Sequence, residues 1–308
     1  MNTSNDGAPL VSVVVPCRGH APELRRCLGS IVMQQCTGIF EIIVVDAAAD
    51  DDVAEAVAAF PGVRLVRSRE GLLPGPARNL GVVHARGSLL LFVDADCTCE
   101  RGWLVAAEAA LQGGCRLVGG AVLDGQPWHP VAATDNLLQF SDLSAQRPRG
   151  PIRLIPSCNL GIRRCDFDAL GGFPAVAAGE DVLFCAAATR QWEDSLSFEP
   201  RMRVRHFGRT SLRAFWRHQE LFGHARGALG LELSPSQRRM GRFAIVAPAV
   251  WAKRLLYLLR RTAASGPAAL GSTLLLLPVV SLGLVAWCAG FRRGCQQAVA
   301  AQLHDTSS

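Results

Sequence analysis

Five apolar residues followed by two carboxylates constrain this chain more than any other stretch. Residues 89–93 are all apolar, and Asp94-Ala95-Asp96 follows them directly. An apolar run this short, preceded by Gly87 and Ser88, is typical of a buried strand in a parallel sheet. The two carboxylates are then expected at the carboxyl end of that strand, where open α/β sheets bind their ligands.

Two carboxylates one residue apart at a strand end predict a divalent-metal site. Buried carboxylates are costly unless they are paired or bound to a cation. Their hard oxygen atoms suit Mg²⁺ or Mn²⁺ better than zinc. For Asp94 and Asp96 taken alone, a loop of solvated acids or a helix cap is an equal alternative.

The preceding residues alternate between short apolar runs and helical periodicity. Strands are expected over residues 10–15, 40–45 and 63–66, each followed by a helix. This order predicts an α/β fold with a doubly wound, mostly parallel sheet. Asp46, which ends the second run, is then expected at the same sheet edge as Asp94 and Asp96. A dinucleotide-binding domain would need a Gly-x-Gly-x-x-Gly turn after the first strand, and Pro16-Cys17-Arg18-Gly19 is not one.

Length and charge narrow the class of protein. A chain of 308 residues has room for one large α/β domain and an appendage. The net charge is +6, but no dense Lys/Arg block with interleaved aromatic residues is present, so nucleic acid is not an expected partner. The arginines between Arg201 and Arg261 precede an apolar region and suit an anionic membrane surface instead. Residues 1–9 are polar and expected to be disordered, with no signal peptide.

The 11 cysteines show no metal-ligand spacing with partner histidines, and Cys97-Thr98-Cys99 is too tight for an ordinary zinc knuckle. They are interpreted as reduced thiols in a cytosolic compartment.

Six short motifs, in this order and spacing, resemble glycosyltransferase family 2. They are Val11-Ser-Val-Val-Val-Pro16, Glu41-Ile-Ile-Val-Val-Asp46, Pro76-Ala-Arg78-Asn79-Leu-Gly81, Asp94-Ala-Asp96, Asn159-Leu-Gly-Ile-Arg163-Arg164 with Leu170-Gly-Gly-Phe173, and Gly179-Glu180-Asp181. The resemblance covers residues 10–227 and implies a GT-A fold that binds a nucleotide-sugar donor.

The resemblance also implies roles for the polar residues on the donor side. Asp96 is expected to bind Mg²⁺ or Mn²⁺ directly, with Asp94 helping to hold the ribose and the metal. His206, at the end of a strand expected over residues 203–207, is a candidate third ligand; a surface histidine is the alternative. Pro16 and Asp46 belong to the donor site, where Asp46 contacts the base or ribose.

Arg78 is a further donor-side candidate, expected near the diphosphate. A surface ion pair on a helix is the alternative for this residue.

On the acceptor side, the resemblance makes Asp181 the general base, preceded by Glu180, and places Asn159 in the acceptor segment. This implies inversion at the sugar carbon by direct displacement. From spacing alone, plain negative charge at a helix N-terminus is the favoured interpretation of Glu180 and Asp181, and the surrounding motifs reverse that preference.

The chain also departs from the family pattern. The family commonly has Asp-Asp-Gly-Ser after its second strand, whereas Asp46 is followed by three alanines, which puts recognition of the base in doubt. Gln219 and the residues after it lack the Arg-Trp of processive synthases, which favours addition of a single sugar. His218 and His224 are interpreted as solvated, and Arg209 either meets a phosphate or lipid headgroup or is solvated.

The C-terminal quarter suggests a membrane. Residues 262–291 contain no charged side chain. This uncharged run is long enough for a transmembrane segment, which is expected near residues 268–291. Residues 243–259 are interpreted as an interfacial amphipathic helix. The division expected is therefore a glycosyltransferase domain over residues 10–227 and a membrane-associated helical region over residues 228–308. A buried helical hairpin of a soluble protein is the alternative.

Because sugar nucleotides are cytosolic, the catalytic domain is expected to face the cytoplasm, with a lipid-linked or membrane-delivered acceptor. Two rival functions remain. One is a nucleotidyltransferase, although the turn after the first strand is too short for its phosphate-binding loop. The other is a catalytically silent, membrane-anchored protein that binds a nucleotide sugar or scaffolds partners.

Overall fold

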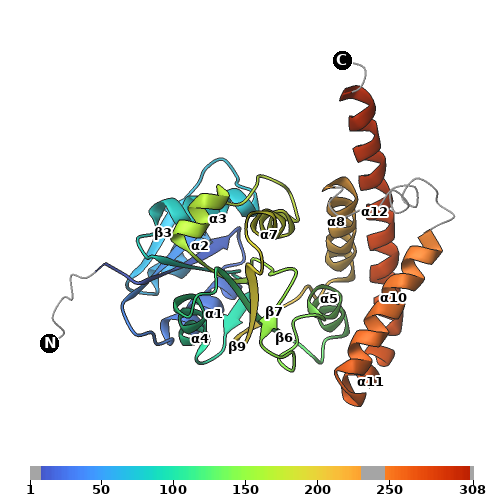
Figure 1. The fold of residues 1–308 in the computed structure, drawn as a ribbon, viewed down its shortest axis with the longest axis horizontal. Coiled ribbons are helices and arrows are strands. Elements are labelled where there is room, and N and C mark those ends of the chain that lie inside the picture. Colours follow the sequence, from blue (N-terminus) through green and yellow to red (C-terminus); the bar gives the residue numbers. More distant parts are fainter. Residues whose placement is uncertain (1–7, 230–246, 306–308) are drawn as a thin grey trace. The chain divides into compact units, whose positions relative to one another are not determined.

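A computed structural model describes residues 8–229 and 247–305 (Figure 1). The chain forms two compact units. The first comprises Met1–Leu123 and Ala145–His206, and the second comprises Asp124–Ser144 and Phe207–Ser308. The division after His206 differs from the expected one after residue 227, and residues 124–144 are an insertion in the first unit that belongs to the second.

The first unit is built on one sheet with the strand order β3-β2-β1-β4-β8-β6-β9-β5, and β7 pairs with β9. The strands are β1 (Val11–Cys17), β2 (Phe40–Asp46), β3 (Val63–Arg67), β4 (Leu89–Val93), β5 (Cys97–Cys99), β6 (Leu117–Asp124), β7 (Gly150–Pro151), β8 (Asn159–Arg163) and β9 (Leu196–His206).

The sheet is mixed rather than mostly parallel. β3, β2, β1 and β4 are parallel, as predicted from the strand–helix alternation. β8 then runs antiparallel to both β4 and β6, and β5 and β7 run antiparallel to β9. The sequence-based expectation fails after β4 because the later strands are not joined by regular strand–helix–strand crossovers.

Six helices accompany the sheet in the described part of the first unit: α1 (Ala21–Val32), α2 (Asp51–Ala58), α3 (Pro74–His84), α4 (Trp103–Gln112), α6 (Arg164–Leu170) and α7 (Glu180–Gln191). α1 buries Leu24, Cys27, Leu28 and Ile31, which recur at helical spacing and form its apolar face. α2 begins after Asp50, whose side chain accepts a hydrogen bond from the Asp52 amide as an N-cap.

An aromatic cluster joins the strand that precedes the two aspartates to the helix that follows Gly179. Phe92 on β4 lies 5.2 Å from Phe173 between ring centroids, and Phe173 lies 4.4 Å from Phe184 on α7. All three side chains are buried. Burial of a phenylalanine stabilises the fold by roughly 2–3 kcal/mol, so this cluster fixes the N-terminus of α7 relative to the end of β4.

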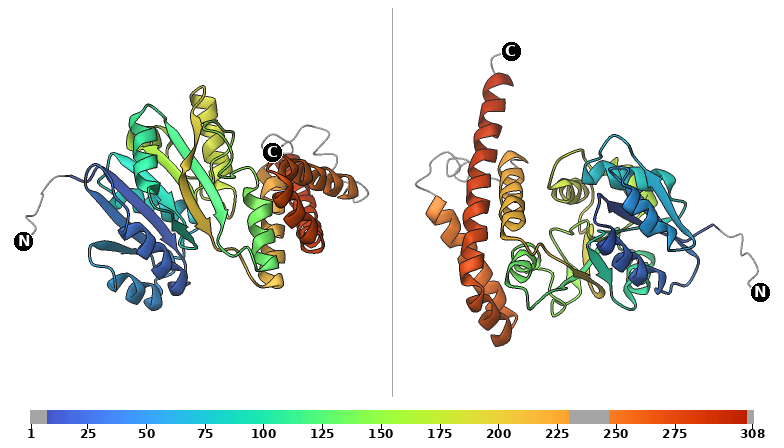
Figure 2. Two further views of the ribbon diagram at one scale, coloured as in Figure 1. Left: turned by 90° about the horizontal axis from the view of Figure 1, so that it is seen from below. Right: turned by 180° about the vertical axis from the view of Figure 1, so that it is seen from behind.

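The second unit is helical, with α5 (Pro130–Phe140), α8 (Leu212–Leu229), α10 (Ala247–Ala264), α11 (Pro267–Leu275) and α12 (Leu277–Asp305). α8 and α12 lie side by side (Figure 1, Figure 2). A Cβ atom at Gly223 would overlap the Trp287 carbonyl oxygen, and one at Gly290 would overlap that of Glu220. Glycine at both positions therefore allows the two helix backbones to touch.

The apolar C-terminal run does not form one straight helix. Across residues 8–229 and 247–305, no single helix is both long and apolar enough to cross a bilayer. Pro267–Leu275 and Leu277–Ala298 together have the length and composition, but they are bent by 72°. The break in the predicted segment near residues 268–291 lies just before Pro278, which occupies the first turn of α12, where its missing N–H leaves no hydrogen bond unmade. The predicted helix over residues 243–259 begins outside the described residues, and its remainder lies in α10.

Candidate active site

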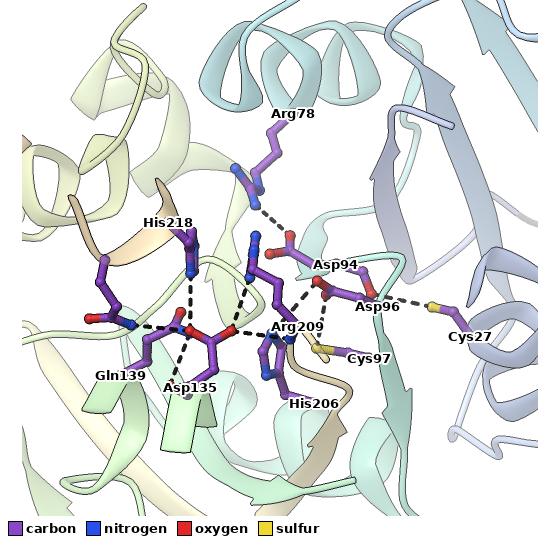
Figure 3. A network of polar contacts seen from close by, with 11 residues as sticks. Cys27, Arg78, Asp94, Asp96, Cys97, Asp135, Gln139, His206, Arg209 and His218 are labelled. Atoms are coloured by element: carbon purple, nitrogen blue, oxygen red, sulfur yellow. Dashed lines mark hydrogen bonds and ion pairs between the residues drawn. The ribbon is translucent and has the colours of Figure 1, made fainter. Parts of the chain in front are cut away.

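The register of β5 and β9 brings together two residues that are far apart in sequence. These strands pair antiparallel, with Cys97 opposite His206. Asp96, next to Cys97, therefore lies beside the imidazole, and its Oδ2 atom is 3.6 Å from His206 Nε2 (Figure 3). The Asp96 side chain is 36% exposed, whereas that of His206 is buried.

A partly exposed carboxylate beside an imidazole nitrogen fits Mn²⁺ or Mg²⁺, whose protein ligands are chiefly oxygen and, for manganese, also nitrogen. Among the residues that the structure describes, no group of three or more His, Cys, Asp or Glu side chains is arranged to hold an ion. This donor set is therefore incomplete by itself. It resembles sites in which one or two carboxylates bind a metal together with substrate phosphates.

Asp94 forms an ion pair with an arginine. Arg78 donates a hydrogen bond from Nη2 to Asp94 Oδ1 and another from Nη1 to Glu180 Oε1 over 2.8 Å (Figure 3). The Arg78 side chain is 3% exposed, so the expected alternative of a surface ion pair is wrong: the pairs are buried. Burial raises the pKa of Asp94 and Arg78 counteracts it.

The base motif opens helix α7. Gly179, with φ of 84°, precedes Glu180 and Asp181, which are the first two residues of the helix. Glu180 is buried and also lies 3.4 Å from the hydroxyl of Ser157, whereas Asp181 is partly exposed. Only Asp181 is therefore open to a reacting group.

The pKa of Asp181 suits a general base. Burial, followed by the neighbouring charge of Glu180, raises the pKa of this carboxyl to about 7. The Val182 and Ser157 amides and the charge of Arg78 act in the opposite direction. A carboxylate with a pKa close to neutrality accepts a proton more readily than an ordinary aspartate.

The donor-side residues of the first two strands lie at the parallel edge. Asp46 is fully buried, and its Oδ2 accepts a hydrogen bond from Arg67 Nε over 3.3 Å. Arg67 also binds Asp51 at 2.9 Å, and Pro16 is half-buried on β1. Arg67 was not predicted from the sequence. β2 and β3 pair in parallel with Asp46 opposite Arg67, so the matching strand ends could have revealed it.

Asn159 bonds to groups inside the fold. Its side chain is fully buried, its Oδ1 accepts from Trp103 Nε1 over 2.8 Å, and its Nδ2 donates to the carbonyls of Ala121 and Met202. Asn159 therefore ties β8 to β6 and β9, and its place in the acceptor segment stays a prediction.

The second unit contains a buried polar network that the sequence analysis did not find. Asp135 on α5 is fully buried and accepts hydrogen bonds from Arg209 Nη1 at 3.3 Å and Gln219 Nε2 at 3.1 Å, and His218 Nδ1 lies 3.2 Å away (Figure 3). Burial by itself raises the pKa of Asp135, but His218 and Arg209 hold it well below its usual range. The interpretation of His218 as solvated is wrong. Helical spacing alone did not reveal the aspartate opposite it.

Comparison with known proteins places the chain in a family. The model of the family described as "Glycosyl transferase family 2" matches residues 12–170, about half of the chain. The chain belongs to glycosyltransferase family 2. This confirms the family that the motifs predict, and the matched residues include the Asp94-Ala95-Asp96 motif and Arg78.

Two curated relatives align with the glycosyltransferase residues. Glycosyltransferase AglE of Haloferax volcanii is 27% identical over 188 residues, which cover 59% of this chain and 62% of AglE. The pre-mycofactocin glycosyltransferase of Mycobacterium tuberculosis is 28% identical over 243 residues, covering 72% of this chain and 47% of that protein. The chain thus spans roughly half to three-fifths of the length of these relatives.

Two solved structures share the fold. The mannosyltransferase PcManGT of Pyrobaculum calidifontis, solved with GDP-Man and Mn²⁺, has a TM-score of 0.54 and 21% identity and covers 97% of this chain and 88% of its own. GalNAc-T7, solved with UDP, GalNAc and Mn²⁺, has a TM-score of 0.52 and 16% identity over 73% of this chain and 51% of its own. These similarities confirm the predicted GT-A-like α/β fold, with the mixed sheet described above.

Proposed function

We propose that this protein transfers one sugar from a nucleotide-sugar donor to a hydroxyl group of an acceptor, with inversion at the sugar carbon. The observation that carries the proposal is that one unit contains two carboxylates in different environments, one suited to a metal ion and one suited to proton abstraction. Asp96 is partly exposed beside His206, and Asp181 is a carboxyl whose pKa of about 7 suits proton abstraction.

The reaction is a single displacement. The acceptor oxygen attacks the anomeric carbon as the bond from that carbon to the diphosphate oxygen breaks, and Asp181 takes the proton of the acceptor hydroxyl. Glu180 does not contact the acceptor in this scheme, because it is buried against Arg78 and Ser157. Its role is to support the neighbouring base.

Asp96 and His206 would hold a divalent ion, with Asp94 at the edge of the same site. When bound, Mg²⁺ or Mn²⁺ neutralises the leaving diphosphate. The Mn²⁺ and nucleotide named for both structural neighbours support this choice of cofactor and of donor class. Pro16, half-buried near the end of β1, would line the nucleoside side. The buried Asp46 at the end of β2 would act on the nucleoside through Arg67, which donates to its carboxylate.

The acceptor is proposed to be lipid-linked or membrane-delivered, with the protein at the cytoplasmic face of a membrane. The support is a stripe on α10. Lys253, Leu256, Tyr257 and Arg260 are all exposed and follow one another at helical spacing, so Leu256 and the Tyr257 ring are flanked by two cations. The Tyr257 hydroxyl donates to Asp142. Such a stripe suits the interface of an anionic bilayer.

Transfer is tested with the full chain in detergent, a bacterial lipid extract as acceptor, and radiolabelled GDP-mannose or UDP-linked sugars as donor. Label is expected in the lipid phase with wild type and with Asp168→Asn, an exposed carboxylate used as the control. Asp181→Asn is expected to lose activity by about 100-fold or more, since general-base catalysis contributes that much. Retained anomeric configuration in the product would refute direct displacement. No transfer by a folded protein that binds the nucleotide would favour the silent binding protein.

The membrane proposal has its own test, flotation with vesicles of phosphatidylcholine alone or with phosphatidylglycerol. The full chain is expected to float with the anionic vesicles. Lys253→Gln with Arg260→Gln should reduce that binding, by about 1 kcal/mol for each removed charge. Arg101→Gln with Arg190→Gln removes two exposed charges from the first unit as the control. Equal loss in both double variants would contradict a role for the α10 stripe.

A further inference from the structure

The motif on α3 is used inside the protein rather than on its surface. Gly75 leaves no room for a Cβ atom against the Pro174 carbonyl oxygen, and one at Gly81 would overlap the Val14 side chain. Asn79 donates from Nδ2 to the Phe173 carbonyl over 2.8 Å and accepts from the Phe173 amide over 2.9 Å. α3 is therefore held against β1 on one side and against the segment that leads into α7 on the other.

Arg78 lies on α3 between the contacts of Gly75 and those of Asn79 and Gly81. Its two terminal nitrogens bind different carboxylates, Nη2 binding Asp94 beyond β4 and Nη1 binding Glu180 at the start of α7. The guanidinium carbon also lies 5.7 Å from the centroid of the Phe173 ring. Because a guanidinium group is planar and rigid, it fixes the spacing of the two carboxylates that it binds, which a lysine ammonium cannot do.

Arg78 also affects the charges of the carboxylates around it. Asp94 and Glu180 are bonded to the buried guanidinium, and Asp181 follows Glu180 directly at the start of α7. A cation buried among several carboxylates reduces the repulsion between them. The charge at Arg78 therefore acts on the donor-side aspartate and on the base side of the site together.

We propose that Arg78 is a positioning residue that joins the two halves of the site: its guanidinium fixes Asp94, which faces the donor, and Glu180, which precedes the base Asp181. The two contacts of Arg78, with Asp94 and with Glu180, are called the brace below. The assignment of Asp181 as the base rests on the function proposed above, whereas the brace does not. Arg78 is thereby distinguished from an arginine that contacts the donor diphosphate directly.

Two substitutions separate the shape of the side chain from its charge. Arg78→Lys keeps the charge and removes the two-pronged contact. Arg78→Gln removes the charge and leaves a side chain that still donates hydrogen bonds. Arg164→Lys and Arg164→Gln are the controls, because Arg164 donates to the backbone carbonyls of Gly87 and Val82 rather than to carboxylates.

Two measurements on the full chain in detergent are needed. The first is ¹³C NMR titration of carboxyl-labelled aspartate, with the Asp181 signal assigned by its loss in Asp181→Asn. The second is calorimetric titration with UDP and with GDP in the presence of Mn²⁺. In Arg78→Gln the titration midpoint of Asp181 is expected to rise by about one pH unit or more, since a nearby cation lowers a carboxyl pKa by that amount.

In Arg78→Lys the midpoint is expected to stay near that of wild type, while nucleotide affinity falls about 10-fold or more through loss of the support to Asp94. A fall in affinity in both Arg78 variants with no movement of the Asp181 midpoint would overturn the brace and favour a direct donor contact. Changes no larger than those of the Arg164 controls would also overturn it.

If Arg78→Gln does not fold, Arg78→Lys is compared in wild type and in Asp94→Asn. Support through Asp94 predicts no further loss of nucleotide affinity in the Asp94→Asn background, whereas an equal loss in both backgrounds, or equality with Arg164→Lys, overturns the proposal. Failure of the proposed function can be distinguished from failure of the brace. If only the proposed function is wrong, wild type binds neither nucleotide, whereas the titration midpoint of Asp181 still rises in Arg78→Gln.

Discussion

Asp181→Asn is expected to make the protein more stable at alkaline pH while it removes the proposed base. A carboxyl whose folded-state pKa is raised binds its proton more tightly in the folded than in the unfolded state. Its contribution to stability is therefore full below the unfolded pKa of 3.8 and is lost as pH rises through about 7. The free energy of unfolding of wild type should fall across this window because of this one group.

The magnitude follows from the two pKa values. A rise from 3.8 to about 7 is about three units, and each unit is worth about 1.4 kcal/mol, so the full loss is about 4 kcal/mol at most. Between pH 5 and pH 8, the part of the window that is practical to measure, wild type should lose about 2 to 3 kcal/mol relative to Asp181→Asn.

The assay is urea unfolding in detergent, followed by tryptophan fluorescence at pH 5, 6, 7 and 8. Wild type, Asp181→Asn and the exposed control Asp168→Asn are compared. The stability difference between Asp181→Asn and wild type should grow with pH, whereas that between Asp168→Asn and wild type should stay flat. A difference that is constant with pH would refute the raised pKa of Asp181.

Three further predictions concern the same residues and their neighbours. The transfer rate should rise about tenfold per pH unit below pH 7 and level off above it, because Asp181 must be ionised to accept a proton; a flat profile from pH 5 to 8 would exclude this carboxyl as the base. His206→Ala should weaken Mn²⁺-dependent nucleotide binding by about 10-fold or more in calorimetry, and unchanged binding would remove His206 from the metal site. Asp135→Asn should lower the free energy of unfolding by about 3 kcal/mol, since it leaves a buried cation network without its carboxylate. Asp142→Asn breaks a surface pair and should cost at most about 1 kcal/mol, so equal losses for Asp135 and Asp142 would contradict the importance of burial.

The parallel half of the fold was predictable because strand and helix periodicities alternate there. The buried strand before Asp94 and the apolar face of α1 both follow from local pattern. The antiparallel half was not, because strands such as β8 and β9 pair through long connections that leave no periodic signal. The family was nonetheless predictable, since the short motifs that contain the site residues occur along the chain in the order typical of the family.

Within the site, the sequence predicted which polar residues lie at the ends of strands, but not which of these residues contact each other. His206 was placed correctly at the end of a strand, although only the register with Cys97 explains its proximity to Asp96. Sequence placed Arg78 near the diphosphate and Asn159 in the acceptor segment, but it did not reveal that both side chains are buried and bonded to other protein groups. Burial of a polar residue depends on tertiary partners that are distant in sequence, so local pattern carries little information about it.

The most direct test of the central claim is calorimetric titration of the detergent-purified full chain with UDP, GDP and their common sugar conjugates. Each titration is run with and without Mn²⁺ on wild type, Asp96→Ala and the exposed control Asp168→Asn. The account predicts that one nucleotide class binds only with the metal, and that binding is lost in Asp96→Ala and kept in Asp168→Asn. Binding that survives in Asp96→Ala, or no binding to any nucleotide by a folded protein, would contradict a metal-dependent donor site at Asp96.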